Sequence, residues 1–149
     1  MRRSDKYPDT DTFHYYNANP RGRITGDCIM RAISTGTEIP YNTVVMELAE
    51  LQCKTGYADD KLYDLYLQNK GWKKCKQPRK SDNTKYTGKE FCCELMRYDS
   101  KIESGDDMHH IIANIGGHHI VAIICGVVYD IWDSTDGCIG NYWIKENKI

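Results

Sequence analysis

Apolar positions in the first two thirds of the chain recur with the three-to-four-residue spacing of amphipathic helices. Ile29, Ala32 and Ile33 show this spacing directly after Asp27. A later helix is bounded by a proline and a glycine, residue types that favour the first turn and the end of a helix. The pattern predicts four helices, at about residues 27–35, 40–56, 59–71 and from 87 onward.

The last third of the chain has short β-branched runs separated by glycine-containing turns, which is typical of strands. Residues 1–24 are polar and turn-rich, and residues 72–86 are basic and polar, so we expect an irregular N-terminal arm and a linker. Helices followed by strands predict an α+β fold. We expect one domain over residues 1–149, with strands at 111–115, 119–124, 127–132 and 139–144.

The composition and charge of the chain argue against several classes of function. The formal net charge of -1 gives no overall attraction to nucleic acid, and the basic run within residues 70–85 is interpreted as a solvated linker. The longest apolar stretch, 120–125, is too short to span a membrane. No secretory signal is recognised, so the seven cysteines are expected to be reduced, in a cytoplasm. Cys92-Cys93 and His109-His110 lack zinc-ligand spacing, and neither metal nor cofactor is expected.

Cys28 follows Gly26 and Asp27 at the predicted start of a helix. The free N–H groups and the positive dipole end of a helix N-terminus stabilise a thiolate, and we expect Asp27 to cap that end. The alternative is that Cys28 is a small buried apolar side chain, which is common for free cysteine. The sequence context favours a nucleophile.

A histidine base and an acid can come from the hairpin folded at Cys125-Gly126. Adjacent strand residues point to opposite faces, so only one of His118 and His119 can face Cys28. A two-residue turn pairs 119 with 132 and 118 with 133, whereas a three-residue turn pairs 119 with 133. Asp133 is the favoured acid and Asp130 is the alternative. Spacing alone leaves these pairings open.

The order of these residues resembles the papain-like and transglutaminase-like cysteine enzyme superfamily. The segment 28–32 resembles its nucleophile helix, 119–124 its histidine strand and 133–135 its acid position. Residues 19–28, 129–133 and 140–143 also resemble small uncharacterised proteins of bacteriophages and mobile elements, over about residues 17–144. Their single histidine aligns with His119. The resemblance implies a papain-like fold and hydrolysis of a peptide or isopeptide bond through an acyl-thioester, with Cys28 as nucleophile, His119 as base and Asp133 orienting it.

One departure from the superfamily concerns the oxyanion donor. Papain-like enzymes carry a glutamine shortly before the cysteine, and here no glutamine precedes Gln52. Asn19, or else Asn17, is the best substitute, with the Cys28 backbone N–H as the second donor.

The expected substrate is a peptide or protein, and for a phage-encoded enzyme the target is a host protein in the host cytoplasm. The alternatives are an acyltransferase of the transglutaminase-like type and a non-catalytic module that binds a host protein or nucleic acid.

Overall fold

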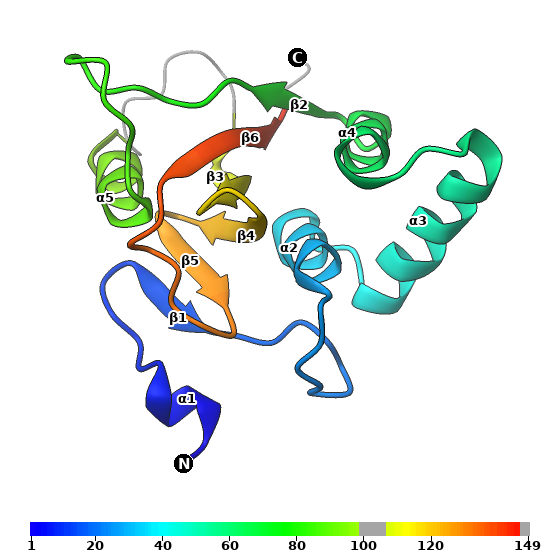
Figure 1. The fold of residues 1–149 in the computed structure, drawn as a ribbon, viewed down its shortest axis with the longest axis horizontal. Coiled ribbons are helices and arrows are strands. Elements are labelled where there is room, and N and C mark those ends of the chain that lie inside the picture. Colours follow the sequence, from blue (N-terminus) through cyan, green and yellow to red (C-terminus); the bar gives the residue numbers. More distant parts are fainter. Residues whose placement is uncertain (99–106, 147–149) are drawn as a thin grey trace.

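The computed structural model describes residues 1–98 and 107–146, which form an α+β structure around a mixed six-stranded sheet (Figure 1). The strand order is β1-β5-β4-β3-β6-β2, and only the pair β1 and β5 is parallel. The strands are β1 (Phe13–Tyr15), β2 (Trp72–Cys75), β3 (Asp107–Ile115), β4 (His119–Ile124), β5 (Val127–Asp130) and β6 (Ile139–Lys145).

Helices cover both faces of this sheet (Figure 1). One core cluster joins α2, α3 and α4 to the sheet and contains Ile33, Leu48, Leu67 and Trp143; a second contains Phe91 of α5 with Val121 and other strand residues. The sheet therefore separates two apolar layers, and α2 packs mainly on β4. The helices are α1 (Arg3–Lys6), α2 (Cys28–Thr37), α3 (Tyr41–Thr55), α4 (Asp59–Asn69) and α5 (Gly88–Tyr98).

The β4–β5 hairpin has the two-residue turn that was one of the expected alternatives. Ile124 pairs with Val127, which leaves Cys125 and Gly126 at the tip with φ of 50° and 78°. Two central residues with positive φ are typical of a type I′ turn, whose twist matches the flanking strands. This register places residue 132 opposite His119, although β5 itself ends at Asp130.

Two segments expected to be irregular contain regular structure. The N-terminal arm includes α1 and β1, and the basic linker begins with β2. Trp72, on β2, is only 4% exposed and belongs to the core shared with α2 and α4. Short strands such as β1 have no strong pattern of their own, because a distant partner, here β5, determines their pairing.

Gly36 allows α2 to lie close to the sheet. A Cβ at this position would be 2.6 Å from Cγ1 of Ile112, which is fully buried on β3. That close approach fixes the helix whose first residue is Cys28. Within the described part of the chain, no helix combines the length and apolar character needed to cross a membrane.

Replacing Gly36 by Ala tests this packing. Alanine improves helix propensity by about 1 kcal/mol, but the clash with Ile112 costs about 1–3 kcal/mol. We expect a net loss in the free energy of unfolding on the order of 1 kcal/mol in urea denaturation. Gly26→Ala is the control, because a Cβ there meets no heavy atom within 4 Å. Equal stability of the two variants would contradict close packing of α2 on β3.

Candidate active site

Cys28 is the first residue of α2, and its side chain is partly buried. Asp27 occupies the N-cap position but makes no side-chain cap hydrogen bond. The expectation that Asp27 caps this helix was therefore wrong, because its carboxylate turns instead to Arg31, Tyr41 and Asn19. The first-turn N–H groups, which have no intrahelical partner, are left without this cap beside the thiol.

His119, the first residue of β4, is the histidine that reaches Cys28. Interaction with the His119 ring lowers the pKa of the Cys28 thiol and raises that of the imidazole, and the backbone N–H of Ile120 also acts on the thiol. His118 is exposed in the turn before β4. The packing of α2 on β4 thus brings together the two residues that the sequence singled out as nucleophile and base.

Asp130, at the end of β5, is the acid that contacts His119. Its Oδ2 lies 2.5 Å from His119 Nε2, which leaves Nδ1 for the thiol. Asp133 instead accepts hydrogen bonds from the backbone N–H and hydroxyl of Thr135, at 3.0 and 2.5 Å. The assignment of Asp133 as the orienting acid was therefore wrong, and the alternative, Asp130, takes that place. The reason is that β5 ends at Asp130, so Asp133 lies in the following turn.

Trp132, in the segment after β5, packs on the His119 ring. Its ring centroid lies 4.9 Å from that of His119, with an interplanar angle of 39°. The His119 side chain is 17% exposed and that of Asp130 only 3%. The pair is therefore shielded from water, which strengthens the charge–charge interaction between the two residues.

These contacts shift the ionisation of the thiol and the imidazole in opposite directions. The hydrogen bond from His119 lowers the pKa of Cys28, against the opposing effect of burial, and the Ile120 N–H contributes in the same direction. Burial alone would lower the pKa of His119, but its hydrogen bonds and charge interactions with Asp130 and Cys28 outweigh that effect and raise it to about 9. The site therefore favours a thiolate–imidazolium pair.

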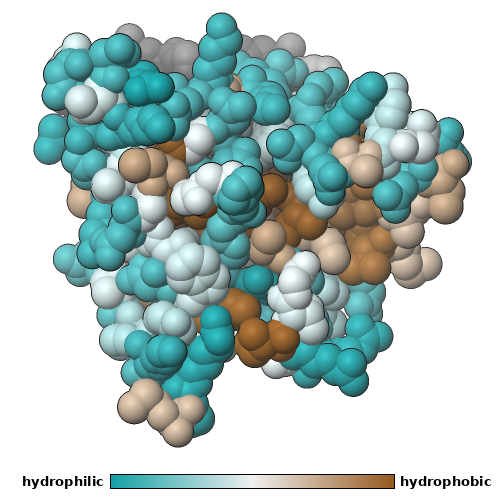
Figure 2. Space-filling view, viewed as in Figure 1, coloured by the Kyte–Doolittle hydropathy of each residue, from teal (hydrophilic) through white to brown (hydrophobic). Residues whose placement is uncertain are grey.

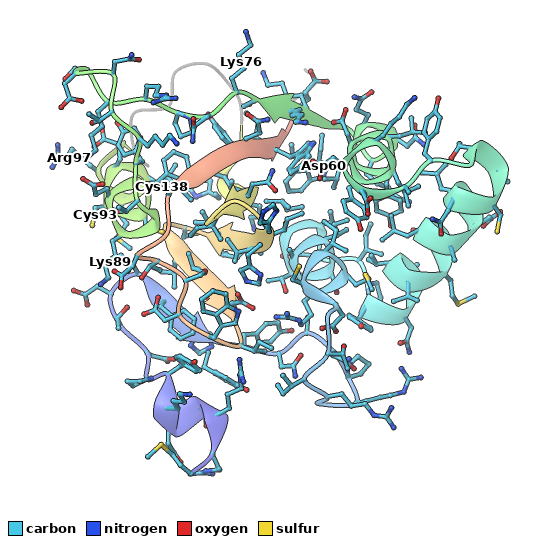
Figure 3. All side chains as sticks on the ribbon, viewed as in Figure 1. Asp60, Lys76, Lys89, Cys93, Arg97 and Cys138 are labelled. Carbon is cyan, nitrogen blue, oxygen red and sulfur yellow. The ribbon has the colours of Figure 1, made fainter. Side chains whose placement is uncertain are left out.

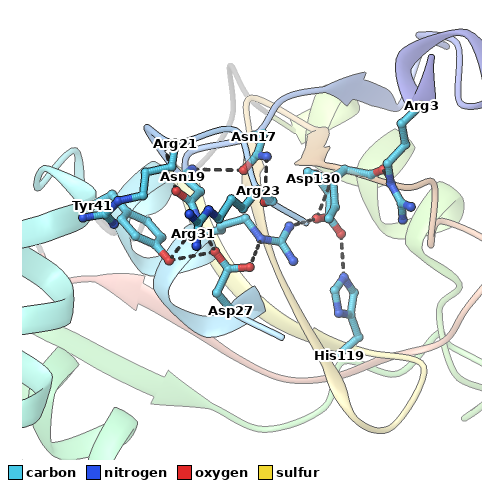
Figure 4. A network of polar contacts seen from close by, with 11 residues as sticks. Arg3, Asn17, Asn19, Arg21, Arg23, Asp27, Arg31, Tyr41, His119 and Asp130 are labelled. Atoms are coloured by element: carbon cyan, nitrogen blue, oxygen red, sulfur yellow. Dashed lines mark hydrogen bonds and ion pairs between the residues drawn. The ribbon is translucent and has the colours of Figure 1, made fainter. Parts of the chain in front are cut away.

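Arg31, one turn after Asp27 on α2, links the two buried carboxylates of the site (Figure 4). Its Nε donates to Asp27 Oδ1 at 2.9 Å and its Nη1 to Asp130 Oδ1 at 2.5 Å. The Arg31 side chain is 7% exposed. Burial works against the charged guanidinium, but the two carboxylates outweigh it and raise the pKa of Arg31.

Asn19 does not provide the expected oxyanion donor. Its Nδ2 donates to Asp27 Oδ2 at 3.1 Å and lies 3.4 Å from the Tyr41 hydroxyl. Asn17 donates its amide to the carbonyl of Arg23. The Asn19 amide thus has two acceptors within this network. One of them is a buried carboxylate, which is a strong acceptor. The remaining candidate donors are the Cys28 backbone N–H and its neighbours at the α2 N-terminus.

The sequence interpretation missed three residues that shape the site, namely Arg31, Tyr41 and Tyr63. Tyr63 lies close enough to Cys28 for the two to interact electrostatically, and burial together with nearby acidic groups raises its pKa. The spacing of Asp27 and Arg31, i and i+4 on a helix, was a usable signal for their ion pair. The pairing with Asp130 and Tyr41 depends on tertiary structure.

A surface hollow lies beside the α2 N-terminus and has both apolar and charged walls. Figure 2 shows hydrophobic side chains gathered around the α2 and α3 region in a surface that is otherwise largely hydrophilic. Two α3 side chains, Val45 and Met46, are 37% and 71% exposed there. The lining of the hollow includes Arg21, Thr25, Asp27, Met30, Tyr41 and Met46 and does not include Cys28.

A second contact between a cysteine and a histidine lies at the surface, where Cys125 Sγ is 3.7 Å from His109 Nδ1. None of the seven cysteines, all of which lie in the described residues, forms a disulfide. Among the same residues, no group of three or more His, Cys, Asp or Glu side chains is arranged to hold a metal ion. Comparison with known proteins gave no match to any protein-family model, curated protein or solved structure. The candidate site is therefore defined by its own geometry.

The titration of His119 distinguishes the two acids. We expect the imidazole to titrate at a pKa of about 9 in NMR spectra of the wild-type protein. Asp130→Asn removes the anionic partner, so burial should bring this pKa down toward or below its ordinary value of about 6.5. Asp133→Asn is the matched control and should leave it unchanged. A fall with Asp133→Asn but not with Asp130→Asn would contradict the geometry.

The same shift has a consequence for stability. His119 holds its proton more tightly in the folded protein than in the unfolded chain. The contribution of this protonation to the free energy of unfolding is therefore complete below about pH 6.5, and it is lost as the pH rises through about 9. The stability difference between wild type and His119→Ala should narrow over that window.

Proposed function

We propose that this protein is a thiol hydrolase that cleaves a peptide or isopeptide bond through an acyl-thioester on Cys28. The observation that carries the proposal is the chain of contacts from Cys28 to His119 to Asp130, in which the pKa of the thiol is lowered and that of the imidazole is raised. A nucleophile, a base and a group that orients the base are what covalent acyl transfer requires.

Each residue has a distinct role in the proposed reaction. The Cys28 thiolate attacks the carbonyl carbon, and the resulting oxyanion is stabilised by N–H groups at the α2 N-terminus. The imidazolium of His119 donates its proton to the leaving amine as the C–N bond breaks, which leaves the acyl-thioester and a neutral imidazole. His119 then accepts a proton from water, the hydroxide attacks the thioester, and the C–S bond breaks to release the acid.

The arrangement supports a papain-like architecture as part of the proposal. The nucleophile begins a helix, the base begins a later strand and the acid ends the neighbouring strand, in the chain order Cys, His, Asp. The helix packs across the strand that carries the base. An amine that replaces water at the thioester would make the same machinery an acyltransferase, and including a primary amine in the assay separates these outcomes.

Selective alkylation tests the activated thiol. Near pH 6, Cys28 should react with iodoacetamide at least about tenfold faster than an ordinary exposed thiol, because an unperturbed cysteine with a pKa of about 8.5 has little thiolate there. Cys93 and Cys138 are internal references, since both are exposed and, in Figure 3, lie on the side of the molecule that carries α5. His119→Ala should remove the advantage. Equal labelling of Cys28 and Cys93 in the wild type would contradict the proposal and favour a non-catalytic binding module.

Acyl transfer itself is tested with an activated ester of a short peptide. We expect a transient adduct on Cys28 by mass spectrometry, followed by release of the acid. Cys28→Ala should abolish turnover, and Asp130→Asn should lower kcat by about 10²–10⁴. Asp133→Asn should stay close to wild type. Turnover that persists in Cys28→Ala, or an adduct at another cysteine, would contradict the proposed mechanism.

A further inference from the structure

We propose that Arg31 is a positioning residue that fixes the Asp130 carboxylate against His119 and so keeps Cys28 nucleophilic. This inference rests on the proposed function and adds to it a residue that does not contact the substrate. Neither the cysteine nor the histidine pattern pointed to Arg31. The inference rests on the place of Arg31 in the fold. It lies on α2, as Cys28 does, and it contacts Asp130 of β5.

Three donors determine how the Asp130 carboxylate is turned. Oδ1 accepts from Arg31 Nη1 at 2.5 Å and from the backbone N–H of Ile131 at 2.7 Å. Oδ2 faces His119 Nε2 at 2.5 Å. With Oδ1 held on one side, the other oxygen is directed at the imidazole. Without Arg31, the carboxylate keeps only the Ile131 N–H on that side and can rotate about its side-chain torsion.

The guanidinium is itself held in place from the opposite side. Asp27 accepts from Arg31 Nε, and it also accepts from the Tyr41 hydroxyl at 2.7 Å and from Asn19 at 3.1 Å. The N-terminal arm and α3 thereby anchor the carboxylate on which Arg31 rests. Figure 4 shows Arg31 lying between Asp27 and Asp130, with His119 beyond Asp130.

The charge of this group also favours an imidazolium. Two buried carboxylates share one guanidinium, so one negative charge is not neutralised by Arg31 and is available to His119 in its protonated form. Removing Arg31 would leave the Asp27 and Asp130 carboxylates without the guanidinium that contacts both of them. The Asp130 carboxylate would then lose the contact on Oδ1 that turns its other oxygen toward His119.

A purely stabilising role for this ion pair is a weaker explanation. Burying charges is costly, and replacing buried ion pairs by apolar side chains is often neutral or stabilising. The charged and titratable groups near Cys28 come from four elements, with Asp27 and Arg31 on or beside α2, His119 on β4, Asp130 on β5 and Tyr63 on α4. Of these, only Arg31 and His119 supply positive charge to the thiolate.

A double-mutant cycle tests the role of Arg31, with Arg31→Met, Asp130→Asn and the double variant compared with wild type. The readout is the pH profile of iodoacetamide alkylation at Cys28, measured by peptide mapping, with circular dichroism to confirm folding. We expect Arg31→Met to slow labelling near pH 6 by about tenfold, equivalent to a rise of about one unit in the apparent pKa. In the Asp130→Asn background the same change should produce less than half of that shift.

Arg31→Lys separates geometry from charge. A single ammonium group keeps the positive charge but lacks the fork that reaches two carboxylates at once. We expect its pH profile to lie closer to Arg31→Met than to wild type. Should Arg31→Met not fold, the lysine variant carries the test, because it retains the buried cation.

The outcomes separate this inference from the proposed function. Equal shifts from Arg31→Met in both backgrounds, or a wild-type profile for Arg31→Lys, would overturn the positioning role while leaving the activated thiol intact. An unactivated Cys28 in the wild type would overturn the proposed function and this inference together.

Discussion

The Asp130 side chain lies where α2, which begins at Cys28, and the strands β4 and β5 meet. Its two oxygens divide their contacts between Arg31 of α2 and His119 of β4, and its side chain is almost fully buried. A buried carboxylate that lost these partners would be strongly destabilised, so the fold must keep both in place. The Asp130 side chain therefore connects α2, β4 and β5 within the site.

The apolar layers make this polar group possible. Ile29 and Ile33 of α2 pack with Ile112 and Ile120 of the sheet, and Gly36 removes the side chain that would hold the helix away. With the helix so close, Cys28 meets the beginning of β4, where the first strand residue is His119. The type I′ turn at Cys125 and Gly126 sets the register that returns β5 to the same end of the sheet. Apolar packing, turn geometry and ion pairing thus together place Cys28, His119 and Asp130 at one end of the sheet.

Much of the fold could be predicted from the sequence, because its longer elements have clear periodicity. The helices beginning near Cys28, Tyr41, Asp59 and Gly88 lie within a few residues of their expected bounds, as do the main strands of the last third. The strands β1 and β2 could not be recognised, since three or four residues carry little pattern and their partners are distant in the chain. The papain-like architecture stays a prediction.

The candidate site was predictable in part. Cys28 at a helix N-terminus follows from local signals, whereas spacing left His118 and His119 open and only the resemblance favoured His119. The choice between Asp130 and Asp133 depended on where β5 ends. The role expected for Asn19 failed because Asp27, rather than a substrate, attracts its amide. Arg31 has a local partner, Asp27, which the sequence indicates. Its second partner lies 99 residues away and could be identified only from the tertiary structure.

The most direct test of the central claim is the ultraviolet absorbance of the Cys28 thiolate, taken as the difference between wild type and Cys28→Ser across a pH titration. Because the interaction with His119 lowers the pKa of Cys28, we predict that the thiolate signal in the wild type rises at a lower pH than that of an ordinary thiol. In Asp130→Asn the signal should appear only at higher pH. A thiolate signal in the wild type that first rises near the ordinary value of about 8.5 would contradict the account.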